Sequence, residues 1–208
     1  LIPLNANYGG ILQAFALQTT LENLGGHDVV VLDNPYLLKM PPKVFRPLVY
    51  AMRLVGRKLG LYHGNIKKEV AKNTYCANTY HFVNTNIHEY YIKGLKDIPK
   101  DRFGAIVVGS DQIWRSYFFH LYFGEMPDAF LRFTDGWNIK RIAYAPSFGV
   151  ETWEYTAEET EECKKYIQKM DAVSCREAEG VEMCRKYLDC DTEKYELDTT
   201  MLLPKADY

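Results

Sequence analysis

A continuous apolar run over residues 103–109 is the feature that most restricts how this 208-residue chain can fold. Such a run is typical of an inner strand in a parallel sheet, which is covered by helices on both faces. Residues 139–145 repeat the pattern, and Thr156 with Glu159 has the capping-box spacing of a helix that reaches Met170. A short strand over 172–175 and a helix over 177–188 follow. This alternation predicts an α/β fold with a doubly wound, mostly parallel sheet.

The beginning of the chain has the pattern of a strand–helix–strand unit. A short apolar run over residues 1–4 leads into a glycine-bearing turn over 5–10. Apolar residues then fill almost every face of a helix over 11–24, which predicts that the helix is buried on most sides. Gly25-Gly26 ends this helix, and the β-branched segment 29–32 predicts the next strand.

We expect one Rossmann-like domain over residues 1–208, with a basic and aromatic insertion at about 36–101. Within the insertion, the pattern predicts only an amphipathic helix over 47–61. Another element is expected to start near Glu196-Leu197. We find no internal repeat and no low-complexity segment.

Composition narrows the classes of protein to which this chain can belong. With 47% hydrophobic and 25% charged residues, it has the composition of a globular protein and not of a disordered chain. It lacks a bilayer-spanning apolar stretch and a recognisable signal peptide. The five cysteines are odd in number and have no framework spacing, which favours reduced thiols and a cytoplasmic location. Residues 151–208 carry a net charge of −8, which argues against binding of nucleic acid there.

Positive charge is concentrated in residues 34–68, which contain eight Lys or Arg residues and no acid. Arg46, Arg53 and Arg57 lie close together on a helical wheel. Such a helix fits peripheral contact with an anionic membrane, here the inner face of the cell membrane, or reception of an anionic substrate. The simpler alternative is a solvated helix face.

The loop after residues 103–109 has the residue types of a binding site. Ligands of open α/β sheets bind just outside the carboxyl ends of the strands. There Asp111 could act as a general base toward a hydroxyl, and Gln112 and Trp114 could hydrogen-bond to and stack on a sugar. Alternatively, Ser110 or Asp111 caps a short helix and Trp114 belongs to the core.

Three other segments could meet at the same edge of the sheet. The turn over 5–10 could bind anions or sugar hydroxyls, or could be only a tight turn. Ser147 could bind a ligand or act as a cap, but no G-x-S-x-G motif supports a nucleophilic serine. Arg176 could clamp a carboxylate or phosphate, although Ser174 to Glu177 also has capping-box spacing. The histidines show no spacing of a zinc site.

Four segments, in order along the chain, resemble the polysaccharide pyruvyl transferase family. They are NYGGILQAFALQ (7–18), VVGSDQIW (107–114), RIAYAPSFG (141–149) and SCRE (174–177). This chain departs from the family pattern at Arg115, where asparagine is usual, and at Pro146, where alanine or glycine is common. Asp198-Thr199-Thr200 stands where the family has Asp-Pro-Thr.

The resemblance implies a glycosyltransferase-B-like architecture, in which two Rossmann-like domains face each other across a cleft. It implies transfer of a pyruvyl group from phosphoenolpyruvate to a sugar of a surface polysaccharide or its lipid-linked precursor, with no metal and no redox cofactor. We expect this chain to be the amino-terminal domain, inactive alone, with most phosphoenolpyruvate contacts on a second domain. Other interpretations are a sugar-nucleotide glycosyltransferase and a non-catalytic module of polysaccharide assembly.

The family-like segments also imply a set of site residues. Asp111 is expected to be the base or to orient the attacking hydroxyl, and Arg176 is expected to reach an anionic group. The expected substrate-binding residues are Asn7, Tyr8, Gly9, Gln13, Ser110, Gln112, Trp114, Ser147 and Arg176. We expect these loops to converge on one rim of the sheet.

Overall fold

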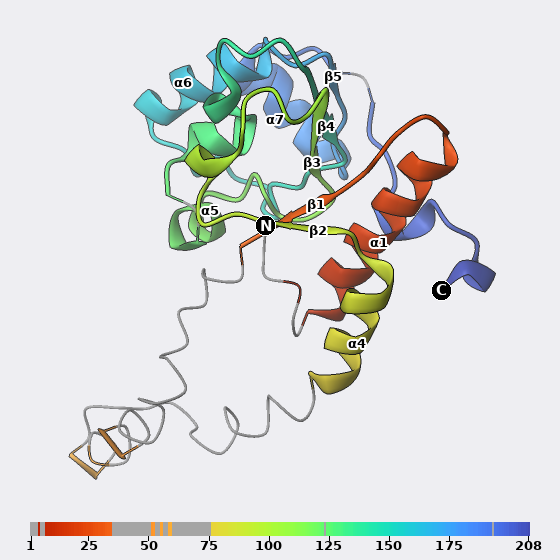
Figure 1. Ribbon diagram of the computed structural model, residues 1–208. Helices are drawn as coiled ribbons and strands as arrows, with labels where there is room; N and C mark the ends of the chain where they lie inside the picture. The colour runs from red at the N-terminus through yellow and green to blue at the C-terminus, as the bar shows by residue number, and fades with distance from the viewer. Residues whose placement is uncertain are drawn as a thin grey trace. The chain divides into compact units, whose positions relative to one another are not determined.

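The chain divides into two compact units. The first comprises Leu1–Ile11 and Val30–Lys93, and the second comprises Leu12–Val29 and Gly94–Tyr208. The computed structural model describes residues 4, 7–34, 76–122, 124–192 and 194–208, together with 51, 52, 55, 58 and 59. Each unit contains parallel strands, which agrees with an α/β fold, but the described strands form two separate sheets and not one (Figure 1).

The first unit holds a two-stranded parallel sheet. β1 (Val31–Asp33) pairs in parallel with β2 (Glu89–Tyr91), so that Asp33 lies opposite Tyr91. The helix α4 (Ala77–Asn86) directly precedes β2, as expected for a parallel pair, which needs a crossover connection. The strand predicted over 29–32 is confirmed, although it begins at Val31, whereas the sequence pattern predicts neither α4 nor β2.

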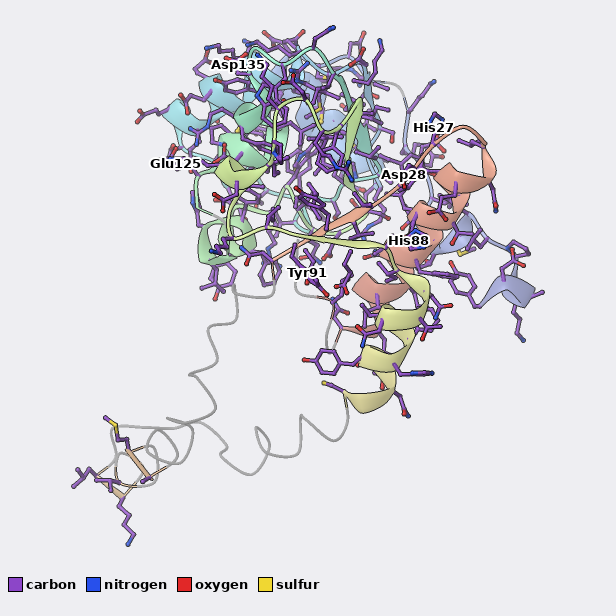
Figure 2. All side chains as sticks on the ribbon, in the orientation of Figure 1. His27, Asp28, His88, Tyr91, Glu125 and Asp135 are labelled. Atoms are coloured by element: carbon purple, nitrogen blue, oxygen red, sulfur yellow. The ribbon has the colours of Figure 1, made fainter. Side chains whose placement is uncertain are left out.

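Two carboxyl groups from neighbouring strands interact in the first unit, namely Asp33 at the carboxyl end of β1 and the half-buried Glu89 at the start of β2. The Asp33 side chain is only 4% exposed and hydrogen-bonds to the Glu89 carboxyl, which requires a proton between them. Burial raises the pKa of both groups. Tyr91, labelled in Figure 2, donates its hydroxyl to Glu89 Oε2 at 2.9 Å. Asp33 Oδ1 has no hydrogen-bond partner among the described residues.

The second unit is built on a three-stranded parallel sheet. Its order is β3 (Ala105–Gly109), β4 (Lys140–Tyr144) and β5 (Ala172–Val173), as Figure 1 shows. β3 and β4 confirm the strands predicted from their apolar runs, but β3 lies at the edge of the described sheet, and only β4 is an inner strand. Between Cys175 and Tyr195 there is one isolated parallel bridge, near the place where a further element was expected.

Helices form at three places along the chain where the sequence predicts them. α1 (Tyr8–Asn23) ends before Gly25 and Gly26, whose φ angles of +84° and +74° are ones that glycine adopts readily. In α1, Ile11, Ala16 and Gln18 are buried and most of the remaining side chains are half-buried.

The two helices in the carboxyl-terminal half are α6 (Ala157–Ile167) and α7 (Ala178–Leu188). The capping box of α6 is confirmed, because the Thr156 hydroxyl accepts from the Glu159 amide and the Glu159 carboxylate accepts from the Thr156 amide. The capping box predicted at Ser174 is wrong. The Ser174 amide donates to Ala143 O at 2.9 Å and so continues the sheet, and Glu177 is the N-cap of α7.

Aromatic side chains form much of the core of the second unit. Trp114 and Phe130 are fully buried and stacked, with ring centroids 4.8 Å apart and planes at 12°. Phe130 belongs to the short 3₁₀ helix η3 (Met126–Phe130), which α5 (Ser116–Tyr122) precedes. The core therefore lies directly beneath the loop that leaves β3.

Two sequence predictions concern a membrane. In the described part of the chain, no helix is both long and apolar enough to cross a bilayer. The helix predicted over 47–61 falls mostly outside the described residues, and Arg46, Arg53 and Arg57 lie outside them altogether.

Candidate functional site

The loops that leave β3, β4 and β5 are hydrogen-bonded to one another. The Ser147 amide donates to Asp111 O at 3.0 Å, and the Arg176 amide donates to Pro146 O at 3.1 Å. Since parallel strands end at the same edge of a sheet, these bonds join the loops into one surface. We name it the carboxyl rim and define it as residues 110–115, 145–149 and 174–177. The predicted convergence is thus confirmed for the three segments of the second unit.

Gly109 allows β3 and β4 to approach closely at this edge. Its φ is +149°, and a Cβ at this position would lie 1.9 Å from the carbonyl oxygen of Tyr144. The next residue, Ser110, has a left-handed φ of 64°, which is unusual for a residue with a side chain. The chain therefore turns sharply as it leaves the sheet, and this turn sets the direction of the whole loop.

Asp198 lies outside the three segments of the carboxyl rim and organises a half-buried polar cluster next to it. Its Oδ2 accepts from Gln13 Nε2 at 2.5 Å and from Arg176 Nη1 at 3.2 Å. The same two donors also reach the carbonyl oxygen of Ser110. A further bond joins the Thr199 amide to Ser110 Oγ at 2.8 Å. The Asp198 carboxylate thus ties Gln13 of α1 and Arg176, which follows β5, to the carboxyl-terminal segment.

Hydrogen bonds keep the Asp198 carboxylate ionised. Burial on its own would raise the pKa of Asp198, but bonds from the Thr200 amide, Gln13, the Thr200 hydroxyl and Arg176 outweigh this effect and lower it. Asp198 also caps the short helix η5 (Thr199–Met201). The Asp-Thr-Thr segment was recognisable in the sequence as family-like, but its pattern assigned no role to Asp198.

Arg176 lies at the end of β5, as predicted, but its charge is already paired. Its Nε donates to Glu177 Oε1 at 2.8 Å, in addition to the contact of Nη1 with Asp198. Burial lowers the pKa of Arg176, and the two carboxylates more than offset this effect, so that the net shift is upward. An anionic ligand at Arg176 would have to compete with both carboxylates.

Asp111 presents a carboxylate that is only partly engaged. Its Oδ1 accepts from the Gln112 amide at 2.7 Å, and the side chain is half-buried. No side chain in the described ranges pairs with this carboxylate. One oxygen thus remains available to a ligand hydroxyl.

Gln112 lies between the loops after β3 and β4. A Cβ on Gly149 would lie 2.6 Å from Gln112 Cδ, so only glycine leaves room for this amide. Gln112 Oε1 accepts from Arg115 Nη1 at 3.3 Å. The amide therefore connects the second loop of the rim to Arg115, an arginine to which the sequence pattern assigned no role.

Three of the predicted site residues are interior, and the first of them, Ser110, is only 1% exposed. Trp114 has no exposed surface, and its indole donates to Ala129 O at 3.3 Å. This is the core position weighed as the alternative, and it leaves no ring face on which a sugar could stack. Ser147 is 1% exposed, and its hydroxyl accepts from the Gly149 amide at 2.9 Å, so it stabilises the loop.

Asn7, Tyr8 and Gly9 belong to the first unit, whereas the carboxyl rim belongs to the second. All three are exposed, and the Asn7 carbonyl accepts from the Ile11 amide at 3.0 Å at the start of α1. Their participation in the same site stays a prediction. No cluster of three or more potential metal ligands occurs among the residues that the structure describes.

Comparison with known proteins gives one positive result. Residues 7–208 match the family model described as polysaccharide pyruvyl transferase. No curated protein and no solved structure matched the chain. The matched range contains every segment of the carboxyl rim, together with Gln13 and Asp198. The chain therefore belongs to the polysaccharide pyruvyl transferase family.

Proposed function

We propose that this protein transfers a pyruvyl group from phosphoenolpyruvate to two hydroxyls of one sugar in a surface polysaccharide or its lipid-linked precursor. Family membership supports the reaction class, and it favours this reaction over a sugar-nucleotide glycosyltransferase. The observation that carries the proposal is the half-engaged carboxylate of Asp111 on a rim of amide, carboxylate and guanidinium groups. Groups of this kind bind the hydroxyls of a carbohydrate.

The proposed reaction requires a general acid, a general base and groups that position the two substrates. A proton adds to the methylene carbon of phosphoenolpyruvate and creates an oxocarbenium-like centre at the neighbouring carbon. One sugar hydroxyl forms a C–O bond there and loses its proton, the C–O bond to phosphate breaks, and phosphate leaves. The second hydroxyl then closes the ketal and loses its proton. The base must therefore lie next to the acceptor sugar.

In this proposal, Asp111 orients the attacking hydroxyl or accepts its proton. Gln13 and Gln112 fix the surroundings of that hydroxyl through their contacts with Asp198 and Arg115. Arg176, Glu177 and Asp198 together carry one positive and two negative charges. This part of the rim therefore suits a neutral sugar better than an anion.

The test is ketal formation by the full-length enzyme carrying Asp111→Asn. We expect the rate to fall by about 10²–10⁴-fold, which is the usual contribution of a positioned acid–base group. Asp101→Asn is the matched control, because it makes the same chemical change on an exposed carboxylate of the same unit. A loss smaller than tenfold at Asp111, or an equal loss at Asp101, would remove Asp111 from the mechanism.

Two further parts of the proposal rest on the sequence and the family. One is a glycosyltransferase-B-like arrangement in which a second domain supplies most contacts to phosphoenolpyruvate. The other is peripheral membrane contact through Arg46, Arg53 and Arg57. Co-sedimentation with anionic vesicles tests the second, and equal binding by a variant without these three charges would refute it.

A further inference from the structure

We propose that Arg115 forms an oxyanion site for the phosphate or the carboxylate of the donor substrate. The identity of the donor rests on the proposed function, whereas the anion site rests on the surroundings of Arg115. The site lies on the carboxyl rim, on the same loop as Asp111.

Within the described residues, Arg115 is a cation without a counter-ion. Among the described residues, its side chain makes one hydrogen bond, from Nη1 to Oε1 of the neutral Gln112 side chain at 3.3 Å. Its Nε is buried and has no acceptor there. A buried donor without a partner is unfavourable, and more so on a charged group. An anion bound at the remaining N–H groups of this guanidinium would neutralise the charge and offset part of that cost.

Other arginines of the second unit show the contrast. The Arg141 guanidinium meets no carboxylate, but its N–H groups donate to the Thr134 hydroxyl and to backbone carbonyls. Arg132 contacts Glu125, labelled in Figure 2, at 2.7 Å and Asp128 at 2.9 Å. Arg185 contacts Glu182 and Asp191, and Arg176 is paired in the same way. Arg132, Arg176 and Arg185 therefore each meet at least two carboxylates, whereas Arg115 meets no carboxylate and a single neutral acceptor in the ranges that the structure describes.

The neighbours of Arg115 fix its position without neutralising it. Phe118 lies against the guanidinium, with Cζ 5.0 Å from the ring centroid. Gln112, confined by Gly149, holds Nη1 from one side. A guanidinium held between an aromatic ring and an amide is pre-organised, and its planar fork suits bidentate contact with two oxygens of a phosphate or carboxylate.

The consequence for the reaction is a division of roles within the rim. Arg115 holds an oxyanion, while Asp111, four positions earlier, faces the sugar hydroxyl. Arg176, the anion-binding residue expected from the sequence, serves instead to stabilise the loop through Glu177 and Asp198.

The experiment measures anion binding by calorimetry and by the thermal midpoint of the full chain. The probes are inorganic phosphate, pyruvate and phosphoenolpyruvate, and the variants are Arg115→Gln and Arg115→Lys. We expect Arg115→Gln to raise the Kd by about 10–100-fold, the usual effect of losing hydrogen bonds to a charged group. Arg115→Lys should lose less, because it keeps the charge but not the planar fork. The matched control Arg185→Gln should bind as the wild type does.

The probes also separate the two sources of the anion. If Arg115→Gln weakens binding of phosphate but not of pyruvate, Arg115 binds the phosphoryl group of the donor. If it weakens binding of pyruvate but not of phosphate, Arg115 binds the carboxylate. Because no described carboxylate pairs with Arg115, Arg115→Gln without added anion should be as stable as the wild type. Reduced stability with unchanged affinity would show a purely structural role and overturn the inference.

Two more outcomes complete the test. Unchanged affinity of Arg115→Gln for phosphate and phosphoenolpyruvate, or no binding by the wild type, would also overturn it. The proposed function fails separately, if the full-length protein forms no ketal while Arg115-dependent binding of phosphate persists.

Discussion

Single side chains hold the carboxyl rim together over long distances in sequence. Asp198 accepts from Gln13, 185 positions earlier, and from Arg176, 22 positions earlier. Ser110 provides the second common acceptor, through its carbonyl oxygen. Removing one member of this group would leave the others partly buried without partners, which costs more than the bond itself contributes.

The first prediction at this scale concerns Asp198→Ala. We expect the free energy of unfolding of the second unit to fall by about 1–3 kcal/mol at neutral pH, because Gln13, Arg176 and the Thr200 amide lose their acceptor. Urea denaturation measures this change. Asp101→Ala serves as the control, since Asp101 is exposed, and a similar loss in both variants would contradict the prediction.

Substitution of Asp198 should also change how the free energy of unfolding depends on pH. The pKa of Asp198 is lowered in the folded protein, so the stability that its charge provides is complete above the unfolded pKa of about 4 and is lost as pH falls through the folded pKa. The difference between wild type and Asp198→Asn should therefore narrow below about pH 4. A difference that stays constant from pH 7 to pH 3 would show that the charge is not involved.

Predictability from sequence also differs between residues of one loop. Trp114 and Arg115 are neighbours, yet one is in the core and the other lies on the rim with a buried Nε that no described acceptor satisfies. Residue type suggested a sugar-binding role for the first and none for the second. Which side chain points inward depends on the turn at Ser110 and on Phe130, and neither is visible in a local pattern.

At the scale of elements, β3 and β4 were predictable as strands because continuous apolar runs are typical of parallel sheets, although β3 lies at the edge of the described sheet. α6 was predictable because its capping box is local. α4 and β2 were not, since the sequence of α4, ANTYHFVNTN, contains few strong helix formers and β2 is only three residues long. Their formation depends on pairing with β1, which is a tertiary effect.

Gly149→Ala tests the contact between the loops after β3 and β4. Gly149 has a φ of +67°, and a Cβ there would press on Gln112. We expect a loss of about 2–4 kcal/mol in the free energy of unfolding, from backbone strain together with the clash. Binding of phosphate should weaken as well, because Gln112 holds Arg115.

A matched control for this variant is Gly136→Ala. Gly136 has a similar φ of +72°, but no described atom lies within 4 Å of the place that a Cβ on this residue would take. It should therefore show only the backbone strain, about 1–2 kcal/mol, and no change in binding of phosphate. Equal effects at both glycines would mean that the Gln112 contact contributes nothing.

At the scale of the whole molecule, the two units should respond to pH in opposite directions. In the first unit, burial raises the pKa of Asp33 and Glu89, so their contribution to stability is complete below about pH 4 and is lost as pH rises through the folded pKa values. In the second unit, hydrogen bonds lower the pKa of Asp198, and those from Lys140 and Lys169 lower the pKa of Asp171 and Asp135. Lowering the pH should therefore stabilise the first unit and destabilise the second.

Glu89→Gln tests the carboxyl pair. A glutamine amide donates to Asp33 without a shared proton, so the first unit should be more stable at pH 7 and should lose most of its dependence on pH between about 4 and 7. Hydrogen exchange followed in peptides from β2 and α7, corrected for intrinsic rates, measures each unit separately. The change should be confined to the β2 peptide, and equal protection in wild type and variant at pH 7 would contradict the prediction.

The aromatic core has a practical consequence for such measurements. The three tryptophans of the chain, Trp114, Trp137 and Trp153, all belong to the second unit. Indole emission therefore reports on that unit alone, and Trp114, stacked on Phe130, should be shielded from an aqueous quencher such as acrylamide. Melting of the first unit should leave this emission unchanged, so an optical trace with one transition can coexist with a molecule that unfolds in two steps.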